Sequence, residues 1–323
     1  MSAAIAEEAA VRVLVVGDAN VDLVLRGDVV PRFGQAEQLL DSADLTLGSS
    51  AGIVAHGLAR LGIPTALAAT VGDDEFGRLT RGWLSAAGVD ISPLGVHPTL
   101  PTGLSVILSA SADRSILTLL GSIPTLTGDA VLAAVRGASH VHFASYFLLP
   151  ELSGQLPIVL QSLRARGITT SLDTNWDPAE KWVGLAAVLP LVDVLLPNLE
   201  ELRAIAGSLG VLGGSDDDLA RRLAGLGPRV VVKAGRAGGW SVTADSPIVR
   251  AAGLVLDARD TTGAGDSFDA GYLAAMASGV QPEAERLRWA TVAGSLSTRA
   301  AGGTPAQATL RELTAHLRLI TPA

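Results

Sequence analysis

The sequence predicts an α/β protein with a doubly wound, mostly parallel sheet and a small β-sheet lid inserted at one end. Two observations predict the sheet: short β-branched runs alternate with helix-like stretches, and these runs are continuously apolar, as in strands buried on both faces. A third predicts the lid, because two segments of alternating apolar and polar residues interrupt this rhythm. Ligands of such sheets bind at the carboxyl ends of the strands.

The predicted elements alternate along the chain. Strands are expected at residues 11–16, 64–71, 140–144, 168–172, 192–196 and 230–233. Helices are expected at residues 53–61, 75–87, 152–166, 199–206, 216–226 and 266–278. The lid takes residues 23–47 and 102–121, which leaves residues 1–22, 48–101 and 122–323 for the large α/β domain.

Composition excludes several classes of protein. Of 323 residues, 48% are apolar and 17% charged, which is too apolar for a disordered chain. With 24 basic and 32 acidic residues the net charge is −8, and without a basic run a nucleic-acid partner is not expected. The absence of cysteine excludes disulfides, thiolate metal sites and a cysteine nucleophile. Because no uncharged apolar run reaches ~18 residues and residues 1–10 lack a basic start, we expect a cytoplasmic protein without a membrane partner.

The segment 260–271 carries the most informative motif, Asp-Thr-Thr-Gly-Ala-Gly-Asp-Ser-Phe-Asp-Ala-Gly, and leads into a helix. Gly263 and Gly265 let the backbone turn tightly and approach a ligand, and the free N–H groups of the first helical turn then form an anion site. Asp266, inside that turn, would serve as a base that takes a proton from a hydroxyl attacking a phosphorus atom. The alternative interpretation is that Asp266 only caps the helix.

Asn198 and Glu201 lie just after the predicted strand at 192–196. At the carboxyl end of that strand they would hold Mg²⁺ through waters, since Mg²⁺ keeps several of its waters. Asn at the N-cap with Glu three residues later is also close to a capping box, and taken alone this pair favours the capping box.

Two further groups follow other strands. Asn20 and Asp22, two residues apart, share one face of an extended chain and suit vicinal hydroxyls, although an Asx turn is the simpler interpretation. Lys233, Gly235 and Gly238 leave the strand at 230–233, where the glycines suit close approach to a nucleotide or an ordinary turn.

Assembled, these motifs resemble the ribokinase-like (PfkB) carbohydrate kinases from about Val13 to Pro305. The segment 260–271 is similar to the family's C-terminal signature, and residues 71–77 with 88–90 match a second family stretch. Thr102 with Gly103 and Arg114 resemble the lid strands, and the Asn198–Glu201 spacing resembles the family's Asn-x-x-Glu element.

The resemblance implies a ribokinase-like fold and transfer of the γ-phosphate of ATP to a hydroxymethyl group of a sugar, with Mg²⁺ and possibly K⁺. It implies Asp266 as the base, with the amides of Gly263, Ala264, Gly265 and Asp266 holding the transferred group. For the other sites it implies the following residues: Asn20, Asp22, Gly48, Ser49, Ile53, Thr102 and Arg114 for the substrate; Asn198, Lys233, Gly235 and Gly238 for the nucleotide; Glu201 for Mg²⁺ through water; and Asp260 and Thr262 for K⁺.

Three positions depart from the family pattern. Ser49 replaces the second glycine of an N-terminal Gly-Gly pair, and Ile53 stands where an Asn usually contacts substrate. Asp177 stands where an Asp-x-Asn-x-Arg element has its Arg, which makes a phosphorylated substrate less expected, although Arg114 could still reach one.

Other functions compete with a sugar kinase. A nucleoside kinase of the same family and a non-catalytic sugar- or nucleotide-binding protein would share the fold. A serine hydrolase is suggested by Gly-Ser-Ser-Ala-Gly at residues 48–52, but His316 alone falls late enough in the chain to complete its triad. The lid sheet predicts a homodimer that pairs lids, as the family often does.

Overall fold

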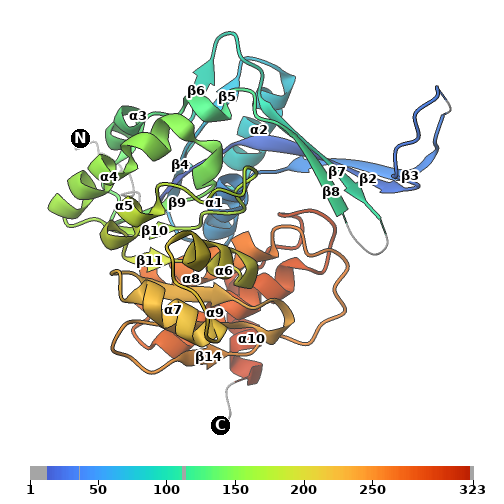
Figure 1. The fold of residues 1–323 in the computed structure, drawn as a ribbon. Coiled ribbons are helices and arrows are strands. Elements are labelled where there is room, and N and C mark those ends of the chain that lie inside the picture. Colours follow the sequence, from blue (N-terminus) through green and yellow to red (C-terminus); the bar gives the residue numbers. More distant parts are fainter. Residues whose placement is uncertain (1–12, 36, 111–113, 321–323) are drawn as a thin grey trace, which may run out of the picture.

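The computed structural model describes residues 13–35, 37–110 and 114–320. An eight-stranded sheet forms the large domain, in the order β14-β13-β12-β11-β10-β9-β1-β4. Strands β12, β13 and β14 pair antiparallel, and the remaining neighbours pair parallel. The lid is a separate four-stranded sheet, β3-β2-β7-β8, which projects from the large domain in Figure 1. The predicted doubly wound sheet with a β lid is therefore confirmed.

The strands of the large sheet are β1 (Val13–Val16), β4 (Thr65–Ala68), β9 (His140–Phe143), β10 (Thr169–Leu172), β11 (Val194–Leu195), β12 (Arg229–Lys233), β13 (Gly239–Val242) and β14 (Val249–Ala251). The lid strands are β2 (Asn20–Gly27), β3 (Leu40–Leu47), β7 (Gly103–Ser109) and β8 (Arg114–Leu119). A further pair, β5 (Thr70–Gly72) and β6 (Gly95–His97), forms a sheet of two strands.

The helices are α1 (Ser50–Arg60), α2 (Glu75–Ala86), α3 (Gly128–Ala134), α4 (Pro150–Ala165), α5 (Leu185–Val188), α6 (Leu199–Ser208), α7 (Asp216–Ala224), α8 (Ala264–Ala277), α9 (Glu283–Ser297) and α10 (Leu310–Ile320). Short 3-10 turns lie at Ile123–Thr125, Tyr146–Leu148, Leu189–Leu191 and Gly235–Ala237. No helix among these described residues is long and apolar enough to cross a membrane.

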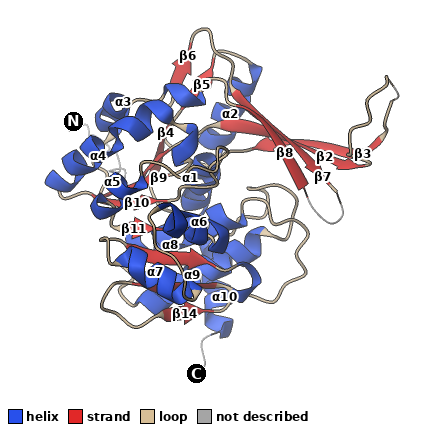
Figure 2. Cartoon of the chain, in the orientation of Figure 1, coloured by secondary structure: helices blue, strands red, loops and turns tan. Residues whose placement is uncertain are grey.

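Helices cover both faces of the large sheet, whereas the lid is built of strands alone (Figure 2). Side chains of β1 alternate between two cores, with Leu14 and Val16 in one and Val13 and Val15 in the other. The first core packs under α3 to α7, and the second packs under α1, α2, α8, α9 and α10. Burial on both faces explains why the central strands are continuously apolar.

Some predicted boundaries shift in the structure. The predicted strand at 64–71 is divided into β4 and β5, and residues 11 and 12 of the first predicted strand lie outside the described residues. The lid boundary predicted at residue 23 falls inside β2, which begins at Asn20, so Asn20 and Asp22 are lid residues. The strands β6, β13 and β14 and the helices α3, α5, α9 and α10 were not among the predicted elements.

The strand order changes direction at β1, which lies between β4 and β9. The chain passes from β1 to β4 on one side and later adds β9 on the other side. Crossover connections therefore diverge at the carboxyl end of β1, which is where open α/β sheets bind their ligands.

Candidate active site

Polar side chains gather where the parallel strands end. Asp18 follows β1, Ser145 follows β9, Asp173 follows β10, Asn198 follows β11 and Lys233 ends β12. Asn198 and Lys233 form an isolated parallel β-bridge, so the segment after β11 lies beside the end of β12. The sheet thus brings to one edge residues that are far apart in the sequence.

The predicted anion-binding turn begins α8. Gly263 is the N-cap residue, with a φ of 68°, and a Cβ atom at this position would lie 2.7 Å from the Cα of Gly303. Gly265 has the Lys233 side chain beside it, with Nζ 3.8 Å from the position a Cβ would take. Gly263 therefore permits the close approach of Gly303, and the turn at Gly265 lies beside the Lys233 cation.

Asp266 is part-buried in the first turn of α8, and its Oδ1 accepts a hydrogen bond from the Ser50 hydroxyl at 2.5 Å. Its carboxylate therefore reaches across to α1. The acids at the same position of α6 and α7 instead complete capping boxes. Removal from water raises the pKa of Asp266 to about 7, helped by the charge of Asp173 and opposed by Ser50 and Lys233.

Lys233 lies between two fully buried carboxylates. Its Nζ is 2.6 Å from Asp173 Oδ2 and 3.1 Å from Asp269 Oδ2. Burial alone would lower the pKa of Lys233, but the two aspartates raise it above its ordinary value. Burial also raises the pKa of Asp269, while Lys233 holds the pKa of Asp173 below its usual range.

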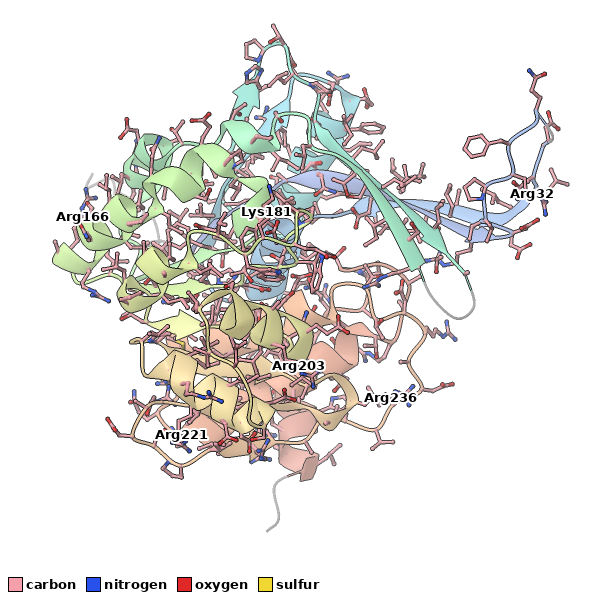
Figure 3. The ribbon with its side chains drawn as sticks, in the orientation of Figure 1. Arg32, Arg166, Lys181, Arg203, Arg221 and Arg236 are labelled. Atoms are coloured by element: carbon pink, nitrogen blue, oxygen red, sulfur yellow. The ribbon has the colours of Figure 1, made fainter. Side chains whose placement is uncertain are left out.

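A pocket of about 350 Å³ adjoins this turn and has the size of a nucleotide site. Lys233, Gly235 and Gly238 line one side, and Ala264, Gly265 and Phe268 of α8 line another. Arg236, labelled in Figure 3, also lines it, together with the loop residues Leu254, Val255 and Leu256. Gly238 is needed for the turn as well, because a Cβ there would lie 2.1 Å from the Ala251 carbonyl oxygen.

Asn198 and Glu201 form the capping box that their spacing favours. The Asn198 Oδ1 accepts the Glu201 amide at 2.9 Å, and Glu201 Oε2 accepts the Asn198 amide at 2.8 Å. Burial raises the pKa of Glu201 to about 7, and the charge of Asp173 adds to the effect. Among the described residues no group of three His, Cys, Asp or Glu side chains could hold a metal. Outer-sphere contact of Glu201 with Mg²⁺ fits this donor set, because Mg²⁺ bound to phosphates keeps several waters.

Asn20, Asp22 and Gly48 lie together at the lid side of the turn. Asn20 Nδ2 donates to Asp22 Oδ1 at 2.9 Å, and the Gly48 amide donates to the Asn20 carbonyl oxygen at 3.0 Å. A Cβ at Gly48 would lie 2.1 Å from Asp22 Oδ1, so glycine is required there. Burial raises the pKa of Asp22 to about 7, despite the Asn20 hydrogen bond that lowers it.

Four other predicted substrate residues have protein partners in the structure. The Ser49 hydroxyl caps α1 by accepting the Gly52 amide at 2.8 Å. The Thr102 hydroxyl donates to Asp74 at 2.7 Å and accepts the Gly72 amide at 2.8 Å. Ile53 is buried against Gly263 and Gly303, and Arg114 donates to Thr262 Oγ1 at 2.9 Å. Their contact with a substrate stays a prediction.

Asp177, which replaces the family's Arg, organises its own loop. It accepts the backbone amides of Ala179, Lys181 and Trp182 at 2.9, 2.8 and 2.7 Å. A buried carboxylate with three such donors has a structural role.

Sequence analysis did not identify Ser50, Asn175, Asp18, Asp173 or Asp269 as site residues. Polar residues that follow a strand or open a helix are site candidates, as Asn20 and Asn198 were. Asp18, Asp173 and Asn175 follow strands and Ser50 opens a helix, so the same rule could have found them. Asp269 carries no such signal, because it lies inside α8 and only packing brings it to Lys233.

A doubly wound sheet, a β lid and a glycine turn that presents amides and a carboxylate define an α/β phosphotransferase with an alcohol acceptor. Residues 11–310 match the family model described as pfkB family carbohydrate kinase. The chain belongs to this family, and it is a sugar kinase.

Characterised relatives include several sugar kinases. The chain is 32% identical over 275 residues to an ATP-dependent ribose-1-phosphate kinase of Halopiger xanaduensis, covering 82% of this chain and 84% of the relative. It is 28% identical to a fructokinase of Klebsiella pneumoniae, covering 90% and 94% of the two chains. Arabidopsis thaliana ribokinase, solved with ribose and ATP, superposes with a TM-score of 0.82 at 24% identity, covering 97% of this chain and 100% of that one.

Two further solved structures share the fold. Adenosine kinase from Sinorhizobium meliloti superposes with a TM-score of 0.81 at 23% identity, covering 97% of this chain and 100% of that one. An E. coli protein solved with ATP and Mg²⁺ superposes with a TM-score of 0.82 at 20% identity, covering 95% and 99%.

The packing of Gly263 against Gly303 generates a stability prediction. Gly279 offers a matched control, because its φ of 76° is similarly left-handed but a Cβ there meets nothing within 4 Å. We expect Gly279→Ala to lower the free energy of unfolding by about 1 kcal/mol through backbone strain alone. Gly263→Ala should cost about 2–3 kcal/mol, because the clash adds to the strain. Urea denaturation measures both, and equal losses would contradict a packing role for Gly263.

Proposed function

We propose that this sugar kinase transfers the γ-phosphate of ATP to a hydroxymethyl group of a sugar, with Asp266 as the general base. The observation that carries the proposal is the Asp266 carboxylate at the start of α8, hydrogen-bonded to a hydroxyl and with a pKa of about 7. It directly follows Ala264 and Gly265, which line the pocket of nucleotide size. A base with a pKa near the working pH is best suited to proton transfer.

In the proposed reaction the sugar oxygen bonds to the γ-phosphorus while its proton passes to Asp266. The bond between that phosphorus and the β–γ bridging oxygen breaks, and ADP leaves. The amides of Gly263, Gly265 and Asp266 stabilise the transferring group, and such preorganised donors need no rearrangement during the reaction. The predicted amide of Ala264 is already engaged, because it donates to the Thr261 carbonyl oxygen at 3.2 Å. Mg²⁺, when bound, would supply charge neutralisation on the phosphates, and Glu201 would contact its waters. The cytoplasm, where ATP is made, is the proposed compartment.

We propose an unphosphorylated sugar as the acceptor, gripped by Asn20 and Asp22. The three lid arginines already have partners, since Arg26 contacts Asp44, Arg32 contacts Asp28 and Arg114 contacts Thr262. Asp177 replaces the cation expected for a phosphosugar. The ribose-1-phosphate kinase and adenosine kinase among the similar proteins define the alternatives. An ADP-release screen over pentoses, hexoses, keto-acid sugars, nucleosides and ribose 1-phosphate separates these acceptors, and no turnover with any of them would favour a non-catalytic binding protein.

Removing the base tests the reaction. We expect Asp266→Asn to lower kcat by about 10²–10⁴-fold, which is the usual contribution of a general base. Exposed Asp245→Asn, which removes an acid outside the site, is the control and should keep wild-type kcat. In the unmodified enzyme kcat/KM should rise with pH through about 7, because Asp266 acts only when its carboxyl is deprotonated. Near-wild-type turnover by a folded Asp266→Asn protein would refute the assignment.

The donors around Asp260 do not fit the K⁺ ion that the resemblance implied. Asp260 Oδ1 accepts the Thr262 amide and hydroxyl at 2.9 and 2.7 Å, and Oδ2 accepts the Gly302 amide at 2.9 Å. Arg26 Nη2 lies 3.7 Å from Oδ2, and Arg114 donates to Thr262. Two guanidinium groups beside one carboxylate would repel an added cation. We therefore propose that Arg26 and Arg114 stabilise the segment with Asp260 and Thr262 in place of K⁺.

Exchange of the monovalent cation tests this replacement. We expect activity to be unchanged when K⁺ replaces Na⁺ or choline at constant ionic strength, which keeps screening of the site equal. Arg26→Ala should lower activity and make it responsive to K⁺, because it removes a guanidinium that lies 3.7 Å from Asp260. Strong activation of the unmodified enzyme by K⁺ would contradict the proposal.

We also propose a homodimer that pairs the outer faces of two lids. Paired lid residues point to the same side of the sheet, so Asp22, Ser105 and Thr118 share the inner face. The opposite face carries apolar residues, namely Leu23, Leu45, Val106, Leu117 and Leu119. Leu117 and Leu119 are 58% and 54% exposed, which is unusual for an apolar sheet face left to water.

Sedimentation analysis tests the dimer. The unmodified chain should sediment as a dimer, and Leu117→Glu should give a monomer, because it places a charge in the centre of the proposed interface. Ile158→Glu on α4 is a matched control, since Ile158 is 70% exposed but lies on the large domain. A monomeric unmodified chain, or loss of the dimer in both variants, would contradict pairing through the lid.

Arg32, at the far tip of the lid in Figure 3, extends beyond the paired strands.

A further inference from the structure

Ser50 is the hydroxyl that the proposed reaction does not use, yet it touches the proposed base. Its Oγ donates to Asp266 Oδ1 at 2.5 Å, between residues 216 positions apart in the chain. Ser50 is the first residue of α1, and Asp266 lies in the first turn of α8. No histidine of the described residues is hydrogen-bonded to Ser50, so this contact is not that of a hydrolase triad.

The neighbours of Ser50 determine which group accepts the hydrogen bond from its hydroxyl. Asn175 Nδ2 donates to Ser50 Oγ at 3.1 Å, so an acceptor position of the hydroxyl is already occupied and its proton is left for Asp266. The Asn175 amide is itself oriented, because its Oδ1 accepts the Ser145 amide at 2.8 Å. Asn175 must therefore present its NH₂ group, and not its oxygen, to Ser50.

A second set of contacts holds the same segment of α1. Ser145 Oγ donates to Asp18 Oδ1 at 2.9 Å, and the same oxygen accepts the amide of Ala51 at 3.1 Å. Asp18 is buried, and it ties the residue after Ser50 to the end of β1. The backbone that carries the Ser50 hydroxyl is therefore held by residues that follow β1 and β9.

The backbone around this hydroxyl adopts an unfavourable conformation. Ser49, Ser145 and Asn175 have φ values of 68°, 56° and 53°, in the left-handed region that non-glycine residues rarely enter. Such conformations persist only where surrounding structure enforces them, and they concentrate at functional sites. Three of them meet at the hydroxyl that touches Asp266.

We propose that Ser50 is a positioning residue for Asp266, which holds one carboxylate oxygen by its hydroxyl and leaves the other oxygen for the acceptor alcohol. This inference rests on the proposed role of Asp266 as the base. A hydroxyl that donates to the carboxylate favours its charged form, which is the form that accepts a proton.

The charges that face Asp266 explain why such a donor is useful. Asp173 and Asp18 lie close enough to raise the pKa of Asp266, and Asp269 is a further neighbouring acid of the cluster. Lys233 is the cation that opposes them, but it is paired with Asp173 and Asp269. Ser50 adds stabilisation to the anion without adding charge beside a bound phosphate.

The test measures the pKa of Asp266 directly, by ¹³C NMR titration of labelled aspartate carboxyls, with Asp266→Asn used to assign the signal. Ser50→Ala should raise this pKa by about one unit, in line with loss of a hydrogen bond to a charged group. The acid limb of kcat/KM should move by the same amount, so that activity falls about tenfold at pH 6 and changes little at pH 9. Ser50→Thr, which keeps the hydroxyl, should restore both values.

Ser267→Ala is the matched control. Ser267 is a buried serine next to Asp266 in the chain, but its hydroxyl accepts a hydrogen bond from Gln307 Nε2 at 3.0 Å. It should leave the pKa of Asp266 and the pH profile unchanged, whatever it does to stability. Asn175→Ala should shift the pKa in the same direction as Ser50→Ala, and the double variant should shift it no further, since Asn175 acts through Ser50.

The outcomes separate this inference from the proposed function. An unchanged carboxyl pKa in Ser50→Ala overturns the positioning role, even if activity falls. A raised carboxyl pKa with an unchanged kcat/KM profile supports the contact but refutes Asp266 as the base. Parallel shifts in both measurements support both.

Discussion

The ion pairs of Lys233 with Asp173 and Asp269 connect the three parts from which the site is built. Lys233 ends β12, Asp173 follows β10, and Asp269 lies on α8, so the pairs tie the sheet edge to the helix that carries the anion-binding turn. Burying two carboxylates and an ammonium group is costly, and it is tolerated because the ammonium nitrogen lies 2.6 and 3.1 Å from the two carboxylates. Their charges also act on the pKa of Asp266 and of Glu201. Architecture and reactivity therefore depend on the same cluster.

The lid is joined to the catalytic turn by charge. Arg26 of β2 and Arg114 of β8 reach Asp260 and Thr262, at the start of the loop that ends in Gly263. The inner face of the same sheet carries Asn20 and Asp22, so the strands that would grip a sugar also contact the turn that would bind phosphate. These contacts between lid and turn would supply the positioning on which phosphoryl transfer depends.

The departures from the family pattern become understandable as local packing solutions. Ile53 fills the space under Gly263 and Gly303, where a polar side chain would need a partner. Asp177 satisfies three backbone amides, which an arginine could not do because it has no acceptor. Ser49 adopts the left-handed conformation and caps α1, and the next residue, Ser50, turns its hydroxyl to Asp266. The substitutions change the surroundings of the site and leave the glycine turn intact.

The sequence by itself determined the alternation of strands and helices, the inserted lid and the glycine turn with Asp266, because hydrophobic periodicity and glycine placement are local signals. It left open whether Asp266, Asn198 and Glu201 cap their helices or act on a ligand, since capping and a functional role use the same spacing. Tertiary structure decided these questions: Glu201 closes a capping box, whereas Asp266 turns to Ser50. It also decided the partners of Lys233 and the pKa values, because burial and charge at a point depend on segments that only folding brings together.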